Sequence, residues 1–242
     1  MNTSRILLFL FIINTSGVTI AQKKSLSEND ILLLTGQGTQ TLHGKGYSLI
    51  KEAADAYTKM KVAASRDGVE FLVVSSYRSF ERQLAIWNHK FKINSKDGMD
   101  PLENIKKITE YSTIPGTSRH HWGTEIDLVS LQPKVEGDVL LTELFEGEGN
   151  YVTLKKWMDT NANSFGFFLA YPNDSIRKGF HYEPWHYSYK PKSKSFLKNY
   201  LKIDLKNILM NKNIFGKELF TEQFIQEYIE DYVLGVSSEI QD

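Results

Sequence analysis

The chain of 242 residues contains no cysteine. This absence excludes disulfide bonds, a catalytic thiol and thiolate metal ligands, so any metal ion must be held by histidine and carboxylate side chains. The sequence also lacks an excess of either charge, because 29 Lys and Arg residues balance 29 Asp and Glu residues. We therefore expect no nucleic acid partner and no acidic interaction tail.

Long apolar runs are lacking as well. The apolar run at residues 6–13 is too short to cross a bilayer as a helix. It follows Arg5 and precedes the small residues around Ala21, which is the order of segments in a secretory signal peptide. We predict a signal peptide at residues 1–21, an exported mature protein in the periplasm or cell envelope of a bacterium, and no stable membrane span after cleavage.

The composition is that of a folded protein, with 41% hydrophobic and 24% charged residues. Residues 22–43 are polar and punctuated by glycine, which predicts an extended lead-in with little regular structure. Apolar residues then recur at three- and four-residue steps, which predicts helices at 50–64, 79–91, 100–111, 151–163 and 220–233. Runs of β-branched and aromatic residues predict strands at 69–75, 124–129, 167–171 and 185–189.

These segments predict one α+β domain at residues 44–190, followed by a helical C-terminal extension at residues 191–242 that packs on the domain. The short apolar, β-branched run at 69–75 predicts a strand that is buried on both faces. In the helix at 100–111, we expect Ile105, Ile108 and Tyr111 to face inward.

Two short motifs carry the side chains of a metal site. His120 and Asp127 lie seven positions apart, and Glu183 and His186 follow some fifty residues later. Two histidines and one aspartate can bind a zinc ion that keeps one position open for water, and a further glutamate can then transfer protons. We expect Pro184 to bend the backbone, so that both side chains of the second motif reach the same site.

A cation completes the predicted site. Arg78 follows directly after a predicted strand, where its guanidinium group can bind a substrate carboxylate or stabilise an oxyanion. The other histidines are predicted to be surface or packing residues, although His121 is adjacent to His120 and could exchange roles with it. These histidines are His43, His89, His121 and His181.

Three motifs occur in a familiar order: Ser76-Tyr-Arg-Ser-x-x-x-Gln83, Ser118-x-His-x-x-Gly-x-x-x-Asp127 and Glu183-Pro-Trp-His186. The chain here resembles the zinc D-alanyl-D-alanine carboxypeptidases of the VanY type, which belong to a larger group with the hedgehog zinc domain and the lysostaphin-like peptidases. The resemblance covers about residues 44–190. It implies an α+β fold in which a small central antiparallel sheet is flanked by helices.

The resemblance also implies a role for each matching residue. His120, Asp127 and His186 would hold one zinc ion per chain, and Glu183 would be the catalytic base. Arg78 would stabilise charge near the scissile carbonyl or bind the terminal carboxylate. The implied substrate is the peptide stem of peptidoglycan, from which a C-terminal D-alanine is removed.

Substrate preference is less closely defined. Ser118 and Gln83 would be among the substrate-contacting residues by the same resemblance. An L,D-carboxypeptidase, an endopeptidase that cuts cross-links and a non-catalytic zinc module like that of hedgehog are the alternatives. Glu125 departs from the family, which often has a small residue two positions before the aspartate. By strand alternation, Glu125 is expected on the metal side, while Ile126 points into the core.

Overall fold

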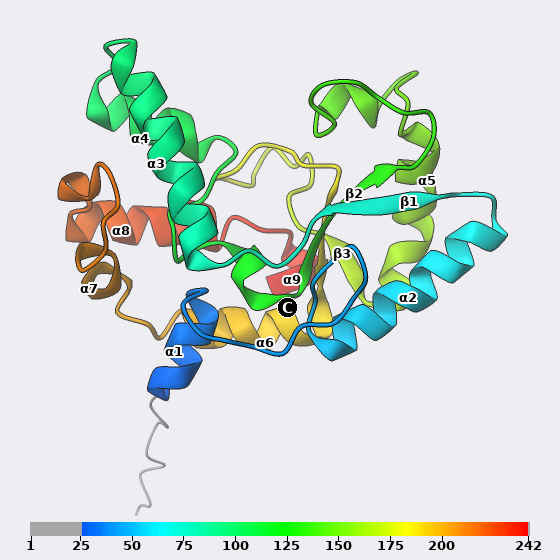
Figure 1. Ribbon diagram of the computed structural model, residues 1–242, viewed down its shortest axis with the longest axis horizontal. Coiled ribbons are helices and arrows are strands. Elements are labelled where there is room, and N and C mark those ends of the chain that lie inside the picture. Colours follow the sequence, from blue (N-terminus) through cyan, green and yellow to red (C-terminus); the bar gives the residue numbers. More distant parts are fainter. Residues whose placement is uncertain (1–25, 242) are drawn as a thin grey trace, which may run out of the picture.

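A four-stranded antiparallel sheet forms the centre of the molecule (Figure 1). The computed structural model describes residues 26–241, so the predicted signal peptide lies outside the described residues. The strand order is β1-β2-β4-β3, with β1 at Phe71–Ser75, β2 at Glu125–Ser130, β3 at Phe167–Leu169 and β4 at His186–Tyr189. The predicted α+β class, the antiparallel sheet and the four strands are confirmed.

Helices surround this sheet (Figure 1). The helices expected near residues 50–64, 79–91, 100–111 and 151–163 are present as α2, α3, α4 and α5. Within residues 26–241, none of the helices has the length and apolar character needed to cross a membrane. The α-helices are α1 (Glu28–Leu34), α2 (Lys51–Arg66), α3 (Phe80–Lys96), α4 (Pro101–Thr109), α5 (Val152–Asn161), α6 (Lys190–Tyr200), α7 (Leu205–Met210), α8 (Glu222–Tyr228) and α9 (Ser238–Gln241).

One face of the sheet is covered by α2 and α5. The alanine-rich side of α2 packs with the buried side of α5 and with Ile126 and Leu128 of β2. Because side chains alternate along a strand, Glu125 and Asp127 point to the opposite face. The sheet therefore separates an apolar core from a polar site, as the alternation predicts.

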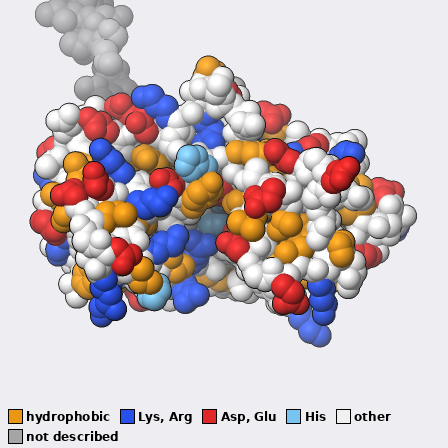
Figure 2. Space-filling view, turned by 90° about the horizontal axis from the view of Figure 1, so that it is seen from above, with side chains coloured by type: hydrophobic (Ala, Val, Ile, Leu, Met, Phe, Trp, Pro, Cys, Tyr) orange, Lys and Arg blue, Asp and Glu red, His pale blue; other side chains and the backbone are white. Residues whose placement is uncertain are grey.

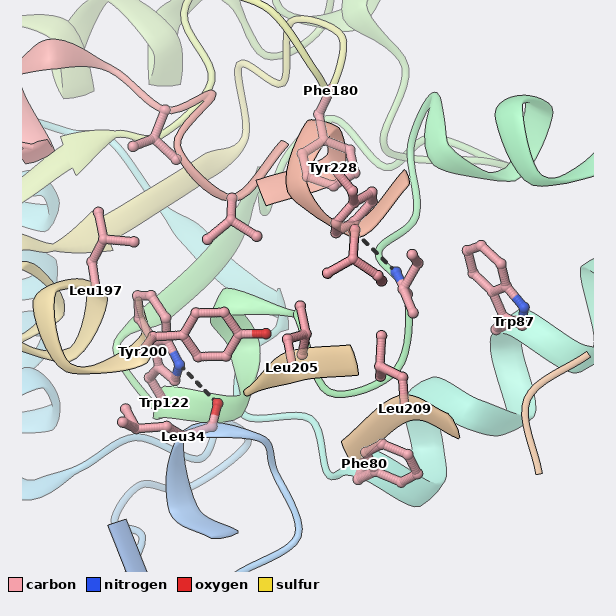
Figure 3. Packing of buried hydrophobic residues seen from close by; sticks show 14 of the residues in the cluster. Leu34, Phe80, Trp87, Trp122, Phe180, Leu197, Tyr200, Leu205, Leu209 and Tyr228 are labelled. Carbon is pink, nitrogen blue, oxygen red and sulfur yellow. Dashed lines mark hydrogen bonds between the residues drawn. The ribbon is translucent and has the colours of Figure 1, made fainter. Parts of the chain in front are cut away.

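The lead-in forms a helix, so the prediction of little regular structure at residues 22–43 was wrong. Helix α1 begins at a capping box, in which the Ser27 hydroxyl accepts from the Asp30 N–H and the Asp30 carboxylate accepts from the Ser27 N–H. Leu34 is buried, and its carbonyl accepts a hydrogen bond of 3.1 Å from the indole of Trp122 (Figure 3). Packing of Leu34 and its hydrogen bond with Trp122, rather than helix propensity alone, stabilise so short a helix.

Two further burial predictions were wrong. Strand β1 is an edge strand, and the Val74 side chain is 40% exposed at an irregularity in the pairing with β2. Tyr111 is 52% exposed because α4 ends at Thr109, before the helical period can turn Tyr111 inward. The Tyr111 ring instead lies 4.9 Å from the His181 ring.

Residues from 191 onwards contribute to the largest of the three apolar cores found among the described residues. Leu205, Leu209 and Tyr228 pack in one buried cluster with Phe80 and Trp87 of α3 (Figure 3). The helix expected at 220–233 is present as α8 followed by a π-helical turn at Ile229–Val233. Its aromatic side is a row of stacked rings, formed by Phe220, Phe224, Tyr228 and Tyr232.

Tyr228 joins this row to the loop that precedes the first metal motif. Its buried hydroxyl accepts from the Ile114 N–H at 3.1 Å and lies 2.9 Å from the Thr117 hydroxyl. We expect Tyr228→Phe to lower the free energy of unfolding by about 1–3 kcal/mol, because a buried N–H loses its partner. Urea denaturation measures this change. Tyr111→Phe, at a half-exposed ring, is the control and should have no effect; equal changes in both variants would contradict the assignment.

Candidate metal centre and active site

Three side chains with metal-binding atoms converge on the polar face of the sheet. His120 lies in a 3-10 turn at Arg119–Trp122, which ends at Gly123 with a left-handed φ of 66° and leads into β2. Asp127 of β2 pairs directly with His186 of β4. All three residues are buried, and one ligand atom from each lies within 4.8 Å of the others. The structure thus brings together the three residues that the sequence predicts as ligands.

In each histidine, one ring nitrogen lies at an oxygen atom outside the metal-binding group, and the other ring nitrogen faces Asp127. His120 Nδ1 lies 2.7 Å from the Ser76 carbonyl, to which it donates, and Nε2 lies 3.4 Å from Asp127 Oδ2. His186 Nε2 lies 3.1 Å from Glu125 Oε2, while Nδ1 lies 3.5 Å from Asp127 Oδ1. His120 therefore presents Nε2 and His186 presents Nδ1 at the centre of the site.

The surroundings of these atoms fit a cation. Asp127 Oδ1 is buried and accepts no hydrogen bond from the residues that the structure describes. Burial raises the pKa of Asp127 to about 6 against the opposing effects of His186 and Arg78, so a metal ion beside this carboxylate would offset a cost of burial. Burial also lowers the pKa of His186, but Asp127, Glu125 and Glu183 outweigh it and raise that pKa to about 10. The donor set of two imidazoles and one carboxylate is one that zinc accepts.

Glu183 lies beside the three ligand residues. The backbone turns sharply at Pro184, because the His186 N–H donates to the Glu183 carbonyl at 3.1 Å. This turn brings Glu183 Oε2 to 2.9 Å from His186 Nδ1. The predicted bend is therefore present, and the Glu183 carboxylate is mostly buried next to the metal-binding atoms.

Arg78 is held rigidly after β1. Its guanidinium donates to Gln83 Oε1 at 2.8 Å and to the Ser75 hydroxyl at 3.0 Å. Burial lowers the pKa of Arg78, and the nearby carboxylates of Asp127 and Glu183 oppose this shift. A cation with a fixed direction thus faces the two carboxylates of the site.

The two residues expected to contact substrate lie in different places. Ser118 lines the cavity, and its hydroxyl accepts from the His120 N–H at 3.3 Å. Gln83 is fully buried and does not line the cavity. Its amide oxygen accepts from Arg78, and its amide nitrogen donates to the Thr113 carbonyl. Gln83 therefore orients Arg78, and a contact of either residue with substrate stays a prediction.

A cavity of about 480 Å³ opens over the metal-binding atoms. Figure 2 shows a hollow in this face of the molecule, with Lys and Arg side chains gathered beside it. Arg78 and Lys90 line the cavity together with the metal motifs, and Leu140, Leu141 and Glu143 from the 132–149 loop line it elsewhere. The aromatic part of the lining comprises Tyr111, Tyr171, Phe180 and Trp185.

Lys90 is a charged residue of the cavity lining that the sequence did not single out. It extends from α3, and its ammonium group donates to the Ser112 hydroxyl at 2.8 Å. Burial lowers its pKa, and the neighbouring Arg78 lowers it further. A signal was present in the sequence, because Lys90 follows Gln83 by seven positions and so lies on the same side of the helix.

His121 is a packing residue, as predicted. Its Nδ1 lies 2.6 Å from the Arg78 carbonyl, and its Nε2 accepts from the Gly116 N–H at 3.1 Å. Both ring nitrogens are therefore engaged by the backbone, which leaves none for a metal ion. Among residues 26–241, the group of side chains placed to hold a metal ion consists of His120, Asp127 and His186.

An antiparallel α+β fold, a buried pair of histidines with an aspartate and an adjacent glutamate together define a metallopeptidase of the hydrolytic zinc type. The chain belongs to the VanY D-alanyl-D-alanine carboxypeptidase family, whose family model matches residues 46–192. The expected family is therefore confirmed, and the matched segment contains all the predicted site residues.

Individual relatives agree with this assignment. The chain is 32% identical over 128 residues to a D-alanyl-D-alanine carboxypeptidase of Enterococcus faecalis, covering 52% of this chain and 42% of the relative. It is 29% identical over 167 residues to a D-alanyl-D-alanine carboxypeptidase of Enterococcus faecium, covering 68% of this chain and 44% of the relative. The chain thus spans less than half the length of these curated relatives. The solved structure of VanYB in complex with D-alanine-D-alanine has a TM-score of 0.51 and 25% identity, covering 73% of this chain and 92% of that one.

Proposed function

We propose that the protein is a zinc-dependent D,D-carboxypeptidase that removes the C-terminal D-alanine from peptidoglycan stem peptides. The observation that carries this proposal is the placement of Arg78 beside the His-Asp-His group and Glu183 in one cavity. In a peptide's last residue only two atoms, Cα and N, separate the free carboxylate from the carbonyl carbon of the amide to be cut, so a cation and a metal site at such close range match the two groups.

One zinc ion per chain is proposed, held by His120 Nε2, a carboxylate oxygen of Asp127 and His186 Nδ1. When bound, zinc lowers the pKa of a coordinated water from 15.7 to about 7 and polarises a carbonyl group. The protein contributes the ligand geometry, since His120 Nδ1 lies at the Ser76 carbonyl and His186 Nε2 lies at the Glu125 carboxylate, which leaves the other nitrogen of each imidazole for the metal ion.

Glu183 and Arg78 act directly on the reacting groups in this proposal. The Glu183 carboxylate takes a proton from the attacking water and transfers it to the amine nitrogen as the C–N bond of the terminal amide breaks. The products are a shortened peptide with a new carboxylate and free D-alanine. The guanidinium of Arg78 stabilises the negative charge that develops on the carbonyl oxygen or binds the terminal carboxylate.

Carboxypeptidase action is favoured over cleavage of cross-links by the cations in the cavity. Arg78 and Lys90 line the same cavity, and each is partly withdrawn from water. Two cations near the site match a substrate that ends in a free carboxylate, whereas the bond in a cross-link lies inside a longer chain. A non-catalytic zinc module has no use for Glu183 or Arg78, so these two residues argue against a hedgehog-like role.

The test is mass spectrometry of purified muropeptides after incubation with the zinc-loaded protein. We expect monomeric pentapeptides to lose one alanine, while tetrapeptides and cross-linked dimers stay intact. Loss of alanine from tetrapeptides would replace the proposal with an L,D-carboxypeptidase, and cleavage of dimers would replace it with an endopeptidase. Chelator-treated protein is the control and should leave every muropeptide unchanged.

Export is a separate part of the proposal. It is supported by the order of Arg5, the apolar run at 6–13 and the small residues around Ala21. Fractionation of bacteria that express the full chain should place the protein outside the cytoplasm, and a chain without residues 1–21 should stay inside. Equal distributions would overturn this part alone.

A further inference from the structure

Glu125 is a fully buried carboxylate that the proposed reaction does not use. It lies on β2 two positions before Asp127 and opposite Ser188 of β4. Its Oε1 accepts from the Thr124 hydroxyl at 2.8 Å and from the Ser188 hydroxyl at 2.7 Å. Its Oε2 lies 3.1 Å from His186 Nε2. Both oxygens are therefore engaged, one by hydroxyl groups and one by a metal-binding histidine.

Arg119 balances the charge of this carboxylate. Its Nε and Nη2 each lie 3.3 Å from Glu125, and Nη2 also donates to the Ser188 hydroxyl at 2.7 Å. The guanidinium group in turn lies 4.7 Å from the centre of the Trp122 ring. Burying two charges is costly unless they are paired and hydrogen-bonded. Both oxygens of Glu125 are engaged, whereas Nη1 of Arg119 has no partner among the described residues, so the arrangement serves the carboxylate more fully than the guanidinium group.

A contact with substrate does not account for Glu125. The residue is fully buried and is absent from the cavity lining, although Asp127 on the same side of the strand lines the cavity. Glu125 thus lies behind His186 as seen from the cavity. Its effect on the site must pass through that imidazole.

We propose that Glu125 is a positioning residue for the metal site, which accepts the Nε2–H of His186 and thereby directs Nδ1 to the metal ion. This inference rests on the proposed zinc site and adds a residue to it. A carboxylate behind a metal-binding histidine fixes the tautomer and the ring orientation and makes the imidazole a stronger donor. Arg119 and Ser188 hold the carboxylate at the correct distance from Nε2. The Arg119–Glu125–Ser188 group is thus the support on which His186 rests.

The test is the zinc affinity of metal-free protein, measured at fixed pH by competition with a chromophoric chelator. We expect Glu125→Gln to lower the affinity by about 10- to 100-fold, because the neutral amide is a weaker acceptor for Nε2–H. Ser193→Ala is the matched control. Ser193 is fully buried, and its hydroxyl lies 2.8 Å from that of Ser188 at the far end of the same group, next to neither Glu125 nor His186 in the hydrogen-bond network. This control should keep the zinc affinity of the wild type.

A second variant keeps the test decisive if Glu125→Gln leaves Arg119 unpaired and the chain misfolds. Arg119→Gln combined with Glu125→Gln removes both charges together and should show the same loss of zinc affinity. Unchanged affinity in either folded variant, as judged by circular dichroism, would overturn the inference. A purely structural role would lower stability with and without zinc alike and leave affinity unchanged.

The outcome is separable from that of the proposed function. If wild-type protein binds no zinc, the proposed metal site fails. If wild-type protein and folded Glu125→Gln bind zinc equally well, only the role of Glu125 fails. If zinc binds and affinity depends on Glu125, but no muropeptide is cleaved, the positioning role stands and the proposed reaction falls.

Discussion

Protein with His186→Ala is expected to lose most of its zinc and all measurable peptidase activity. Only His120 and Asp127 then remain of the three residues whose metal-binding atoms lie within 4.8 Å of one another. Two ligands do not hold a zinc ion that must also keep a position open for water. Elemental analysis after gel filtration measures the metal content, which should fall from about one ion per chain towards zero.

His181→Ala is the control for this variant. His181 is an exposed histidine that contacts the ring of Tyr111 and takes no part in the metal-binding group. It should retain the zinc content of the wild type. Activity in wild-type protein from which all metal has been removed would contradict the proposed chemistry as a whole.

Protein with Glu183→Gln is expected to keep its zinc and lose turnover by about 10²- to 10⁴-fold, the range typical of a lost general base. Glutamine has nearly the size and shape of glutamate, so it fills the same space beside His186 Nδ1, but it cannot accept a proton. The measurement is kcat with a pentapeptide substrate, together with the zinc content of the same preparation.

Glu110→Gln is the control for a change of carboxylate to amide. Glu110 forms a surface ion pair of 2.8 Å with Lys107, away from the metal-binding atoms, and its substitution should leave kcat unchanged. Wild-type turnover in zinc-loaded Glu183→Gln would remove Glu183 as the base. Loss of both zinc and turnover would instead show that Glu183 supports metal binding.

The convergence of the three proposed ligands could be predicted from the sequence because each of the two motifs is local. Strand alternation placed Asp127 opposite Ile126, and Pro184 signalled the bend that brings Glu183 to His186. Each of these features depends on a few neighbouring residues. Placing the two motifs together required only that β2 and β4 pair, which two short strands in one small sheet readily do.

The partners of Glu125 could not be predicted in this way. They depend on the register that sets Glu125 opposite Ser188, and on an arginine that reaches back from the turn before β2. The helix α1 was missed for a related reason. Its capping box was visible in the sequence, but its stability depends on the contact between Leu34 and Trp122, residues 88 positions apart.

Burial of β1 was mispredicted because an apolar run does not show which strands cover its edge. The irregular pairing near Val74 also affects residues of the proposed active site. Irregularities of this kind redirect a strand end, and the end of β1 supplies the Ser75 hydroxyl to Arg78 and the Ser76 carbonyl to His120.

The buried cluster shared by α3 and the residues after 191 sets the size of the smallest working fragment. The family match ends at residue 192, yet Leu205, Leu209 and Tyr228 cover apolar side chains of α3 that would otherwise face water. A fragment trimmed to the matched residues would keep the three proposed metal ligands but would expose apolar side chains of its core to water. For expression, fusion or transplantation, the catalytic unit therefore extends at least to Ile240, which is fully buried.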